Sequence, residues 1–570
     1  MDKTIITNNS RVYEKYKNFY EVIYLENGSY TDVLYKTRDL IHKGKILLTH
    51  PMAGSLKPNQ TPYKSVILGN TCTNDFKSIM LIENSLESAF KFLKFKKTPA
   101  WTSKILNDFK TVDLSLIENV INNPMFKIIW FTNKGKKKEV KNLRLELGKI
   151  KINDVQFGDK TEVSKGTLYV NKEEIIKLVL EDERILKADV ELARPGESIR
   201  IAPVKDVIEP RVKVSGSGAI FPGTVNKVKQ VGSGRTHALV GATVITCGRI
   251  VGFQEGLIDM SGPAAKYTPF SETNNVCIVI EPVEGIETHD YEAAGRMAGL
   301  KVATYIGEAG RNVEPDEVVV YETKPLLQQV NEYPDLPKIG YVHMLQSQGL
   351  LHDTFYYGVD AKVMVPTFMY PTEIMDGAIV SGNCVAPCDK VTTFHHLNNP
   401  VIEDLYKRHG KDLNFIGVVL TNENVFLADK ERSSDMTAKL CEYLGLDGVL
   451  ITEEGYGNPD TDLMMNCKKV SQKGVKVVLI TDEFPGRDGK SQSLADAVEE
   501  GDALVSCGNG NVIIDFPPME KVIGTLDFIE TMIGGYEGSL KPDGSIEAEL
   551  QIVIASTIAN GYNKLAARGY

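Results

Sequence analysis

The last third of the chain alternates short apolar segments with helical ones, and this pattern strongly limits its possible folds. Apolar segments cover residues 415–421, 448–452, 475–482 and 503–506, and helical spacing lies between them, first at 434–443. Strands that are apolar along their whole length are buried on both faces, and helical connections imply a parallel sheet. The pattern therefore predicts a C-terminal doubly wound parallel sheet.

Polar residues follow each of these predicted strands. They occupy positions 421–424, 452–460, 481–483 and 507–511. Ligands of open parallel sheets collect at the carboxyl ends of the strands, so we expect a pocket there. Ordinary turn chemistry also accounts for many of these residues.

The rest of the chain has two different patterns. Residues 2–7, 20–25 and 45–50 resemble strands, and 11–16 and 30–42 have helical spacing, which predicts a small N-terminal α/β module. Residues 143–280 form a β-rich middle region with short apolar strands at 242–248 and 276–281. We expect an α/β protein overall.

Charge divides the chain at one point. Residues 1–140 contain 22 Lys and Arg against 13 Asp and Glu, whereas the remainder contains 43 against 62. Such a shift indicates two modules, joined at the lysine-rich segment 132–141. This segment could be a solvated linker or a nucleic-acid patch. It lacks interleaved aromatic residues and a nucleic-acid fold, so we interpret it as a linker and expect no nucleic-acid partner.

The composition is that of a globular protein, with 42% apolar and 25% charged residues. The chain has no run of about 18 apolar residues, so we expect no membrane-spanning helix. The first residues lack the basic and apolar regions of a secretory signal. Eight cysteines without a regular framework fit a reducing compartment. These features predict a cytoplasmic protein.

The segment 370–388 contains Asn383 and Cys384 directly after a glycine. A thiol at this position can attack the preceding carbonyl and convert the amide to a thioester. Elimination of the sulfur and hydrolysis then leave a pyruvoyl group, an electrophilic ketone that captures amines. Two other interpretations remain open: a buried structural cysteine, or a zinc site with Cys388, which would need two more ligands.

A long stretch of the chain, from about residue 143 to 570, resembles the precursor of the pyruvoyl-bearing subunits of glycine/sarcosine/betaine reductase component B. The resemblance lies in nine segments: 144–150, 190–198, 201–211, 231–237, 252–256, 341–346, 349–353, 381–384 (Ser-Gly-Asn-Cys) and 458–462. It implies that the precursor is cut between Asn383 and Cys384 and that Cys384 becomes the pyruvoyl cofactor. The products would be residues 1–383, containing an alpha-type region at 143–383, and a beta-type chain, 384–570.

The N-terminal module, residues 1–131, resembles the GrdX-like proteins. Segments 30–34, 38–44 and 48–51 carry this match, and residues 132–142 form the predicted linker. No activity follows from this resemblance. A role in assembly, maturation or regulation is a hypothesis.

The reductase resemblance also implies a reaction and its partners. A substrate amine would condense with the pyruvoyl ketone as a Schiff base, and a selenol or thiol of another subunit would displace the amine. The chain contains no selenocysteine. The implied partners are therefore a selenocysteine-containing component B subunit, selenoprotein A, component C, which forms acetyl phosphate, and the thioredoxin system, as in anaerobic amino-acid fermentation. No metal or nucleotide is implied.

Several residues are candidates for assisting roles. Ser381, His395 and His396 are near the bond in sequence and could polarise its carbonyl or take a proton, although each could equally be structural. Cys388 could be a resolving thiol or a spectator. Arg235, in the glycine-rich loop 231–237, could bind the substrate carboxylate. The loop follows no strand-to-helix nucleotide pattern.

The substrate cannot be fixed by the motif alone. Glycine and sarcosine can form the imine, whereas a quaternary amine such as betaine cannot. We expect glycine, with sarcosine next and betaine as a further alternative. Hypotheses of another kind are an uncleaved, non-enzymatic ligand-binding protein of about 63 kDa, the mass of the intact chain, and a pyruvoyl decarboxylase that needs no selenoprotein.

Overall fold

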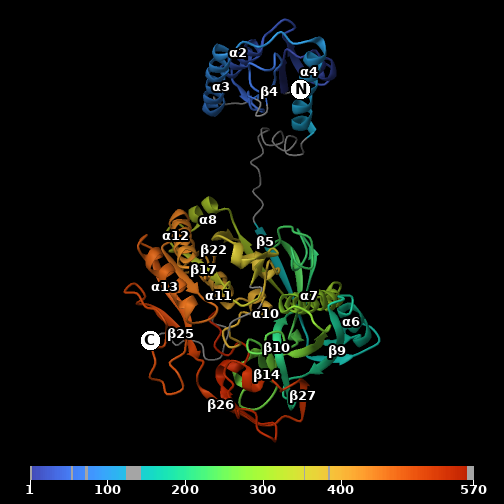
Figure 1. Cartoon of the computed structure of the whole chain (residues 1–570), viewed down its shortest axis with the longest axis vertical. Coiled ribbons are helices and arrows are strands. Elements are labelled where there is room, and N and C mark those ends of the chain that lie inside the picture. The colour runs from blue at the N-terminus through green and yellow to red at the C-terminus, as the bar shows by residue number, and fades with distance from the viewer. Residues whose placement is uncertain are drawn as a thin grey trace. The chain divides into compact units, whose positions relative to one another are not determined.

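A computed structural model describes most of the chain as two compact units, residues 1–140 and 141–570 (Figure 1). The described residues are 3–52, 56–70, 75–122, 143–351, 354–382 and 386–560. The predicted linker, 132–142, lies outside them, as do Asn383 and Cys384. No helix in these ranges is long and apolar enough to cross a bilayer.

The N-terminal unit is a four-stranded sheet between two pairs of helices. Its strand order is β2-β1-β4-β3, with β1 parallel to β2 and antiparallel to β4. Ile6 of β1 packs with helices α2 and α3 on one face, and Ile5 packs with α1 and α4 on the other, because neighbouring strand residues point to opposite faces. The elements are β1 (Lys3–Thr7), α1 (Ser10–Tyr16), β2 (Glu21–Tyr24), α2 (Tyr30–Ile41), β3 (Lys45–Leu47), β4 (Ser65–Asn70), α3 (Phe76–Phe95) and α4 (Ser103–Asn122).

Local signals explain the helix starts of this unit. Asn9 caps α1, and Ser29 and Asp32 form a capping box at α2. The strands and helices predicted up to residue 50 are all present, with α1 one residue longer than predicted and β2, α2 and β3 shorter, whereas α3 and α4 were not predicted.

The middle of the chain is β-rich, as expected. A six-stranded sheet has the order β14-β10-β13-β15-β9, with β27 also paired to β10, and a four-stranded sheet has the order β11-β12-β5-β16. Helices α6 and α7 pack on the first sheet. The elements are β5 (Leu143–Lys151), β6 (Asp154–Phe157), β7 (Glu162–Ser164), β8 (Thr167–Val170), α6 (Lys172–Val179), β9 (Ile185–Ala193), β10 (Ile199–Ile208), β11 (Arg211–Ser215), β12 (Gly234–Val240), β13 (Ala242–Cys247), β14 (Gly256–Asp259), β15 (Asn274–Pro282), α7 (Thr288–Gly307), β16 (Glu317–Thr323) and β27 (Lys521–Gly524).

A second six-stranded sheet, mostly parallel, contains the four apolar strands predicted from the sequence. Its order is β20-β22-β17-β23-β24-β25, and only the edge strand β20 is antiparallel. Helices α12 and α13 cover one face. Helix α11 and residues of β5 and β12 cover the other. The elements are α8 (Leu326–Glu332), β17 (Lys338–Leu345), β20 (Thr367–Met369), α11 (Pro400–Arg408), β22 (Asn414–Asn422), α12 (Leu427–Tyr443), β23 (Gly448–Thr452), α13 (Asn458–Ser471), β24 (Lys476–Glu483) and β25 (Leu504–Asn509).

Strand β17 was not predicted, and its position matters for the site. It lies between β22 and β23, although it comes before residue 384 in the chain and they come after it. The parallel sheet therefore draws on both sides of the predicted cut and is not confined to the last third. The α/β class is confirmed.

Shorter elements connect these sheets. They are β18 (Phe355–Tyr356), β19 (Val359–Asp360), α9 (Pro371–Met375), β21 (Ile379–Val380), α10 (Thr393–Leu397), β26 (Ile513–Phe516) and β28 (Ile546–Glu549), with 3-10 turns at Ala265–Tyr267, Pro269–Glu272, Glu308–Gly310, Ala361–Val363, Ile529–Thr531 and Leu550–Ile552.

Candidate functional site

The described chain reaches Gly382, one residue before the predicted scissile bond. Its carbonyl oxygen accepts hydrogen bonds from Lys205 Nζ at 3.2 Å and from Lys390 Nζ at 3.0 Å. Gly382 and both lysines are buried. Buried cations are rare and are usually paired, so two that meet at one carbonyl oxygen mark a specialised position.

Lys205 also belongs to a buried ion network. It projects from β10 toward Glu292 of α7, with Nζ and Oε1 3.1 Å apart, and Arg296 contacts the same carboxylate at 3.2 Å. Burial lowers the pKa of Lys205, and Glu292 opposes this effect. The carboxylate thus compensates part of the cost of burying the lysine.

Ser381 is held through its backbone. Its N–H donates to Thr393 Oγ1 at 3.0 Å, and Thr393 Oγ1 donates to Asp206 Oδ2 at 2.7 Å. Burial raises the pKa of Asp206, while Lys390 and Lys205 lower it. Adjacent residues of β10, Lys205 and Asp206, therefore anchor the two residues that precede Asn383.

The two candidate histidines lie on the short buried helix α10. His395 Nδ1 is 2.8 Å from Thr392 Oγ1, and its ring packs edge-on against Phe270. Burial lowers the pKa of His395 to about 3, so the imidazole is neutral near pH 7. A neutral imidazole with this pKa is a weak base, which disfavours His395 as the proton acceptor.

His396 is joined to a second buried histidine that sequence reasoning did not select. His396 Nδ1 is 3.3 Å from His343 Nε2, and His343 Nδ1 is 2.9 Å from the Tyr341 hydroxyl. Burial lowers the pKa of both imidazoles, to about 3 for His343. Among the described residues, His396 Nε2 has no hydrogen-bond partner. Burial thus keeps His396 and His343 neutral near pH 7, as it does His395.

Acidic residues at the carboxyl end of the parallel sheet anchor the loop from the other side. Glu454 Oε1 accepts the N–H of Val391 at 3.0 Å, and Glu423 Oε1 accepts the N–H of Glu454 at 2.8 Å. Burial raises the pKa of Glu423, Glu453 and Asp482 well above the usual range. The polar strand ends therefore hold buried carboxyl groups that pack against the loop.

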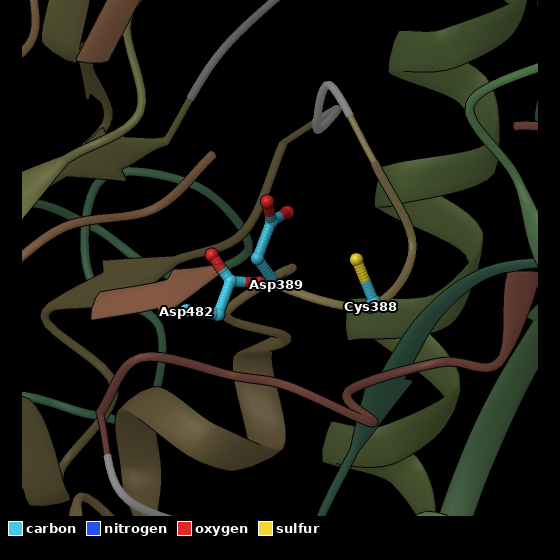
Figure 2. A group of neighbouring side chains, drawn as sticks. All are labelled: Cys388, Asp389 and Asp482. Atoms are coloured by element: carbon cyan, nitrogen blue, oxygen red, sulfur yellow. The ribbon is translucent and has the colours of Figure 1, made fainter. Parts of the chain in front are cut away.

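Cys388, Asp389 and Asp482 form a small buried group in which the candidate ligand atoms all lie within 4.8 Å of one another (Figure 2). Asp482 Oδ2 accepts a hydrogen bond from Thr557 Oγ1 at 2.5 Å. Burial raises the pKa of Cys388 well above its usual value, which disfavours the thiolate that a metal or a resolving role requires. His395 and His396 are not part of this group. The three residues could contact a metal but do not complete the four ligands of a structural zinc site.

Arg235 lies in a different setting from the buried loop. Its Nη2 and Nε atoms lie 2.6 and 2.9 Å from Glu146 Oε2, and its side chain is 40% exposed. The glycine-rich loop before it packs on Asp376, which accepts the N–H of Gly232 at 2.7 Å. The guanidinium is thus engaged with a carboxylate of the same chain, and substrate binding by Arg235 stays a prediction.

Sequence reasoning missed Lys205, Asp206 and Lys390. Two of them, Lys205 and Asp206, are adjacent charged residues inside a strand whose ten residues are all buried. Charges in such a strand are a signal, since they must find partners. Their partners lie 177 and 187 residues further along the chain, and no local pattern indicates so distant a pairing.

Comparison with known proteins places the chain in a family. The model described as "Glycine/sarcosine/betaine reductase component B subunits" matches residues 143–568, and that described as "GrdX-like protein" matches residues 4–122. No solved structure matches the chain.

Three relatives illustrate the match. The chain is 79% identical over 428 residues to the sarcosine reductase complex component B subunit alpha of Peptoclostridium acidaminophilum, covering 75% of this chain and 100% of the relative. It is 62% identical over 430 residues to glycine reductase complex component B subunits alpha and beta of Acetoanaerobium sticklandii, with the same coverage. It is 40% identical over 422 residues to betaine reductase complex component B subunit alpha of P. acidaminophilum, covering 71% and 95%. The predicted resemblance is confirmed: the chain belongs to the family of glycine/sarcosine/betaine reductase component B subunits.

Proposed function

We propose that this chain is the precursor of the pyruvoyl-bearing part of an amino-acid reductase, and that it is cut between Asn383 and Cys384. The observation that carries the proposal is the pair of buried lysines, Lys205 and Lys390, on the carbonyl oxygen of Gly382. A structural cysteine in a loop needs no such arrangement beside it. A pyruvoyl group at position 384 would supply a ketone that condenses with the substrate amine.

The described residues have a definite task in this proposal. The peptide group that follows Gly382 is planar, so two hydrogen bonds to its carbonyl oxygen restrict the orientation of the chain entering the scissile bond. Thr393 and Asp206 fix Ser381 in the same way. Positioning of this kind lowers the entropic part of a barrier before any proton moves. Ser381 stays a candidate for polarising the Asn383 carbonyl, and His396 for taking a proton, although burial lowers the pKa of His396 as it does that of His395, so neither imidazole is a strong base.

For the substrate we propose sarcosine, with glycine as the alternative. The sequence alone favoured glycine. The identities of 79% to a sarcosine reductase subunit and 62% to glycine reductase subunits favour the secondary amine. Both amines can condense with a ketone, whereas a quaternary amine cannot. Initial rates with sarcosine, glycine and betaine, each supplied with the same partner proteins, decide between them.

The nucleophile and the reducing equivalents are proposed to come from other proteins. The six described cysteines are all buried. Burial raises the pKa of Cys247, Cys277, Cys441 and Cys467, as it does for Cys388. Thiols in such surroundings are poor nucleophiles. The partners implied by the family resemblance, a selenocysteine-containing subunit, selenoprotein A, component C and thioredoxin, would complete the route to acetyl phosphate and the released amine.

The test is the intact mass of the purified protein, with and without borohydride. We expect two chains, residues 1–383 and 384–570, the second without the Cys384 sulfur and gaining two hydrogens on reduction. A single full-length chain that keeps a titratable thiol at Cys384 after prolonged incubation would refute the proposal and favour a ligand-binding protein. For the GrdX-like unit we propose a role in assembly, maturation or regulation, tested by comparing cleavage of the full chain with cleavage of residues 141–570.

A further inference from the structure

An exposed apolar patch lies at the carboxyl end of β22. Val425, Phe426 and Leu427 are consecutive and are 57%, 72% and 66% exposed. Leu350, Val363 and Val365 are also exposed. These six residues are called the carboxyl-edge patch below. Single exposed apolar residues are normal, but a run of three with further members beside it marks an interaction site.

Hydrogen bonds join the three segments that carry the patch. Gln348 Nε2 donates to the carbonyl of Asn424 at 3.0 Å, next to Val425. Asn422 Nδ2 donates to the carbonyls of Ala361 and Met364 at 3.0 and 3.1 Å. Lys362 Nζ in turn donates to the carbonyl of Gly349 at 3.0 Å. The patch is therefore one surface built on loops that are tied together.

The local sequence is poor for stability at this point. Phe426 occupies the N-cap position of α12 and makes no side-chain capping hydrogen bond. Ser, Thr, Asp and Asn are strongly preferred at this position because their oxygen atoms accept a helix N–H. An exposed phenylalanine forgoes this stabilisation without burying its own ring. Such violations of local rules are expected at functional surfaces.

A series of hydrogen bonds links the patch to the candidate site. Glu423, three residues before Phe426, binds the N–H of Glu454, and Glu454 binds the N–H of Val391. Val391 follows Lys390, which contacts Gly382. Two buried carboxyl groups thus connect the surface loop to the segment before the predicted cut.

We propose that the carboxyl-edge patch docks the partner protein that brings the thiol or selenol nucleophile to the substrate. This inference rests on the proposed function. Two observations favour a partner of this chemistry: the described cysteines are all buried, and the relatives are named as component B subunits of reductase complexes. An apolar surface with an exposed aromatic residue is typical of interface centres.

The test replaces Phe426 with serine. Serine is a good N-cap residue, so F426S folds and its melting temperature does not fall. The control is Leu327→Ser, a comparably exposed leucine of α8. The next turn of α8 contacts the opposite end of β22, where Asn414 Nδ2 donates to the carbonyl of Gln329. Each variant is assayed for sarcosine-dependent turnover while the selenocysteine-containing component B subunit is titrated.

We expect F426S to raise the concentration of that subunit needed for half-maximal rate by about tenfold or more, in line with the loss of an aromatic interface centre. Self-cleavage and borohydride-dependent trapping of sarcosine stay at the wild-type level, and L327S matches wild type throughout. An unchanged titration would overturn the docking proposal. If F426S also lost self-association, the patch would be assigned to contact with a second copy of this chain. A wild-type protein without any borohydride-reactive group would instead overturn the proposed function.

Discussion

Lys390→Met is the sharpest perturbation of the proposed cleavage site. In the described part of the chain, Lys390 Nζ donates a hydrogen bond to the Gly382 carbonyl oxygen at 3.0 Å. Methionine has nearly the same length and is apolar, so it fills the buried space without a donor. Lys205 remains on the same oxygen at 3.2 Å, which keeps the carbonyl partly satisfied. The substitution therefore removes one hydrogen bond and the favourable charge of Lys390 near Asp206, and it leaves the ion pairs of Glu292 with Lys205 and Arg296 in place.

The magnitude follows from the strength of such a bond. A hydrogen bond from a charged donor contributes about 1.5–3 kcal/mol net. If the interaction is needed to hold the chain in the reactive arrangement, and about 1.36 kcal/mol corresponds to a tenfold change in rate, cleavage slows by about 10- to 150-fold. In the double variant K205M/K390M the buried carbonyl loses both lysines. Because the two lysines share this partner, the rate effects of the two single variants should not add.

The assay follows the appearance of the two fragments after translation of the precursor, with the folded fraction measured by thermal melting. Lys390→Arg keeps a donor and should restore part of the rate. Lys213→Met is the matched control, since Lys213 is a buried lysine paired with Asp376 and has no recorded contact with Gly382. Cleavage of folded K390M at the wild-type rate would refute the reasoning, and so would an equal slowing by K213M at equal stability.

Three further predictions follow from other parts of the site. Burial raises the pKa of Glu423 well above its usual 4.5, so the stability that it contributes is present below about pH 4.5 and is lost as pH rises toward the folded-state pKa. In denaturant titrations, E423Q should therefore gain stability relative to wild type as pH rises above 4.5, by at most about 1.4 kcal/mol per pH unit, and a pH-independent difference would contradict this. Strand β17 lies between β22 and β23, so the fragments 1–383 and 384–570 should elute as one species in native gel filtration and as two species in guanidinium chloride. Separation of the fragments in native buffer would show that the sheet does not hold them together. Cys388 should resist alkylation by iodoacetamide at pH 8 in the native protein and react after unfolding, and rapid native modification would argue for an accessible thiolate.

The elements that could be predicted are those whose own residues determine burial. Strands β22, β23 and β24 stand out because long apolar runs are buried on both faces of a parallel sheet, whereas β25, at the edge of the sheet, is only partly buried. Strand β17 contains Tyr341 and His343, whose polar atoms hydrogen-bond inside the core, so it does not have the same apolar pattern. Its place in the sheet depends on hydrogen bonds to β22 and β23, which come much later in the chain, and no local sequence pattern indicates such long-range pairing.

The candidate site follows the same division. Asn383 and Cys384 were predicted from a short motif and a family resemblance, and their roles stay predictions. Lys205 and Asp206 could not be connected with that motif, because the strand that carries them meets the loop only in the folded chain. Arg235 was selected for its glycine-rich loop, and the structure places it in an exposed ion pair with Glu146. The local motif indicates a chemistry, whereas the residues that lie beside it are determined by long-range pairing in the folded chain.

The arrangement of strands bears on when the proposed cleavage can occur. Lys205 lies on β10, which also pairs with β27 from the far end of the chain. Lys390 is held through Val391 and Glu454 at the end of β23, and β23 pairs with β17. Both lysines therefore reach Gly382 only after segments from before and after residue 384 have assembled. An unfolded precursor lacks this arrangement, so the proposed cleavage should follow folding, and its two products should stay associated because strands from both sides of the cut are already paired.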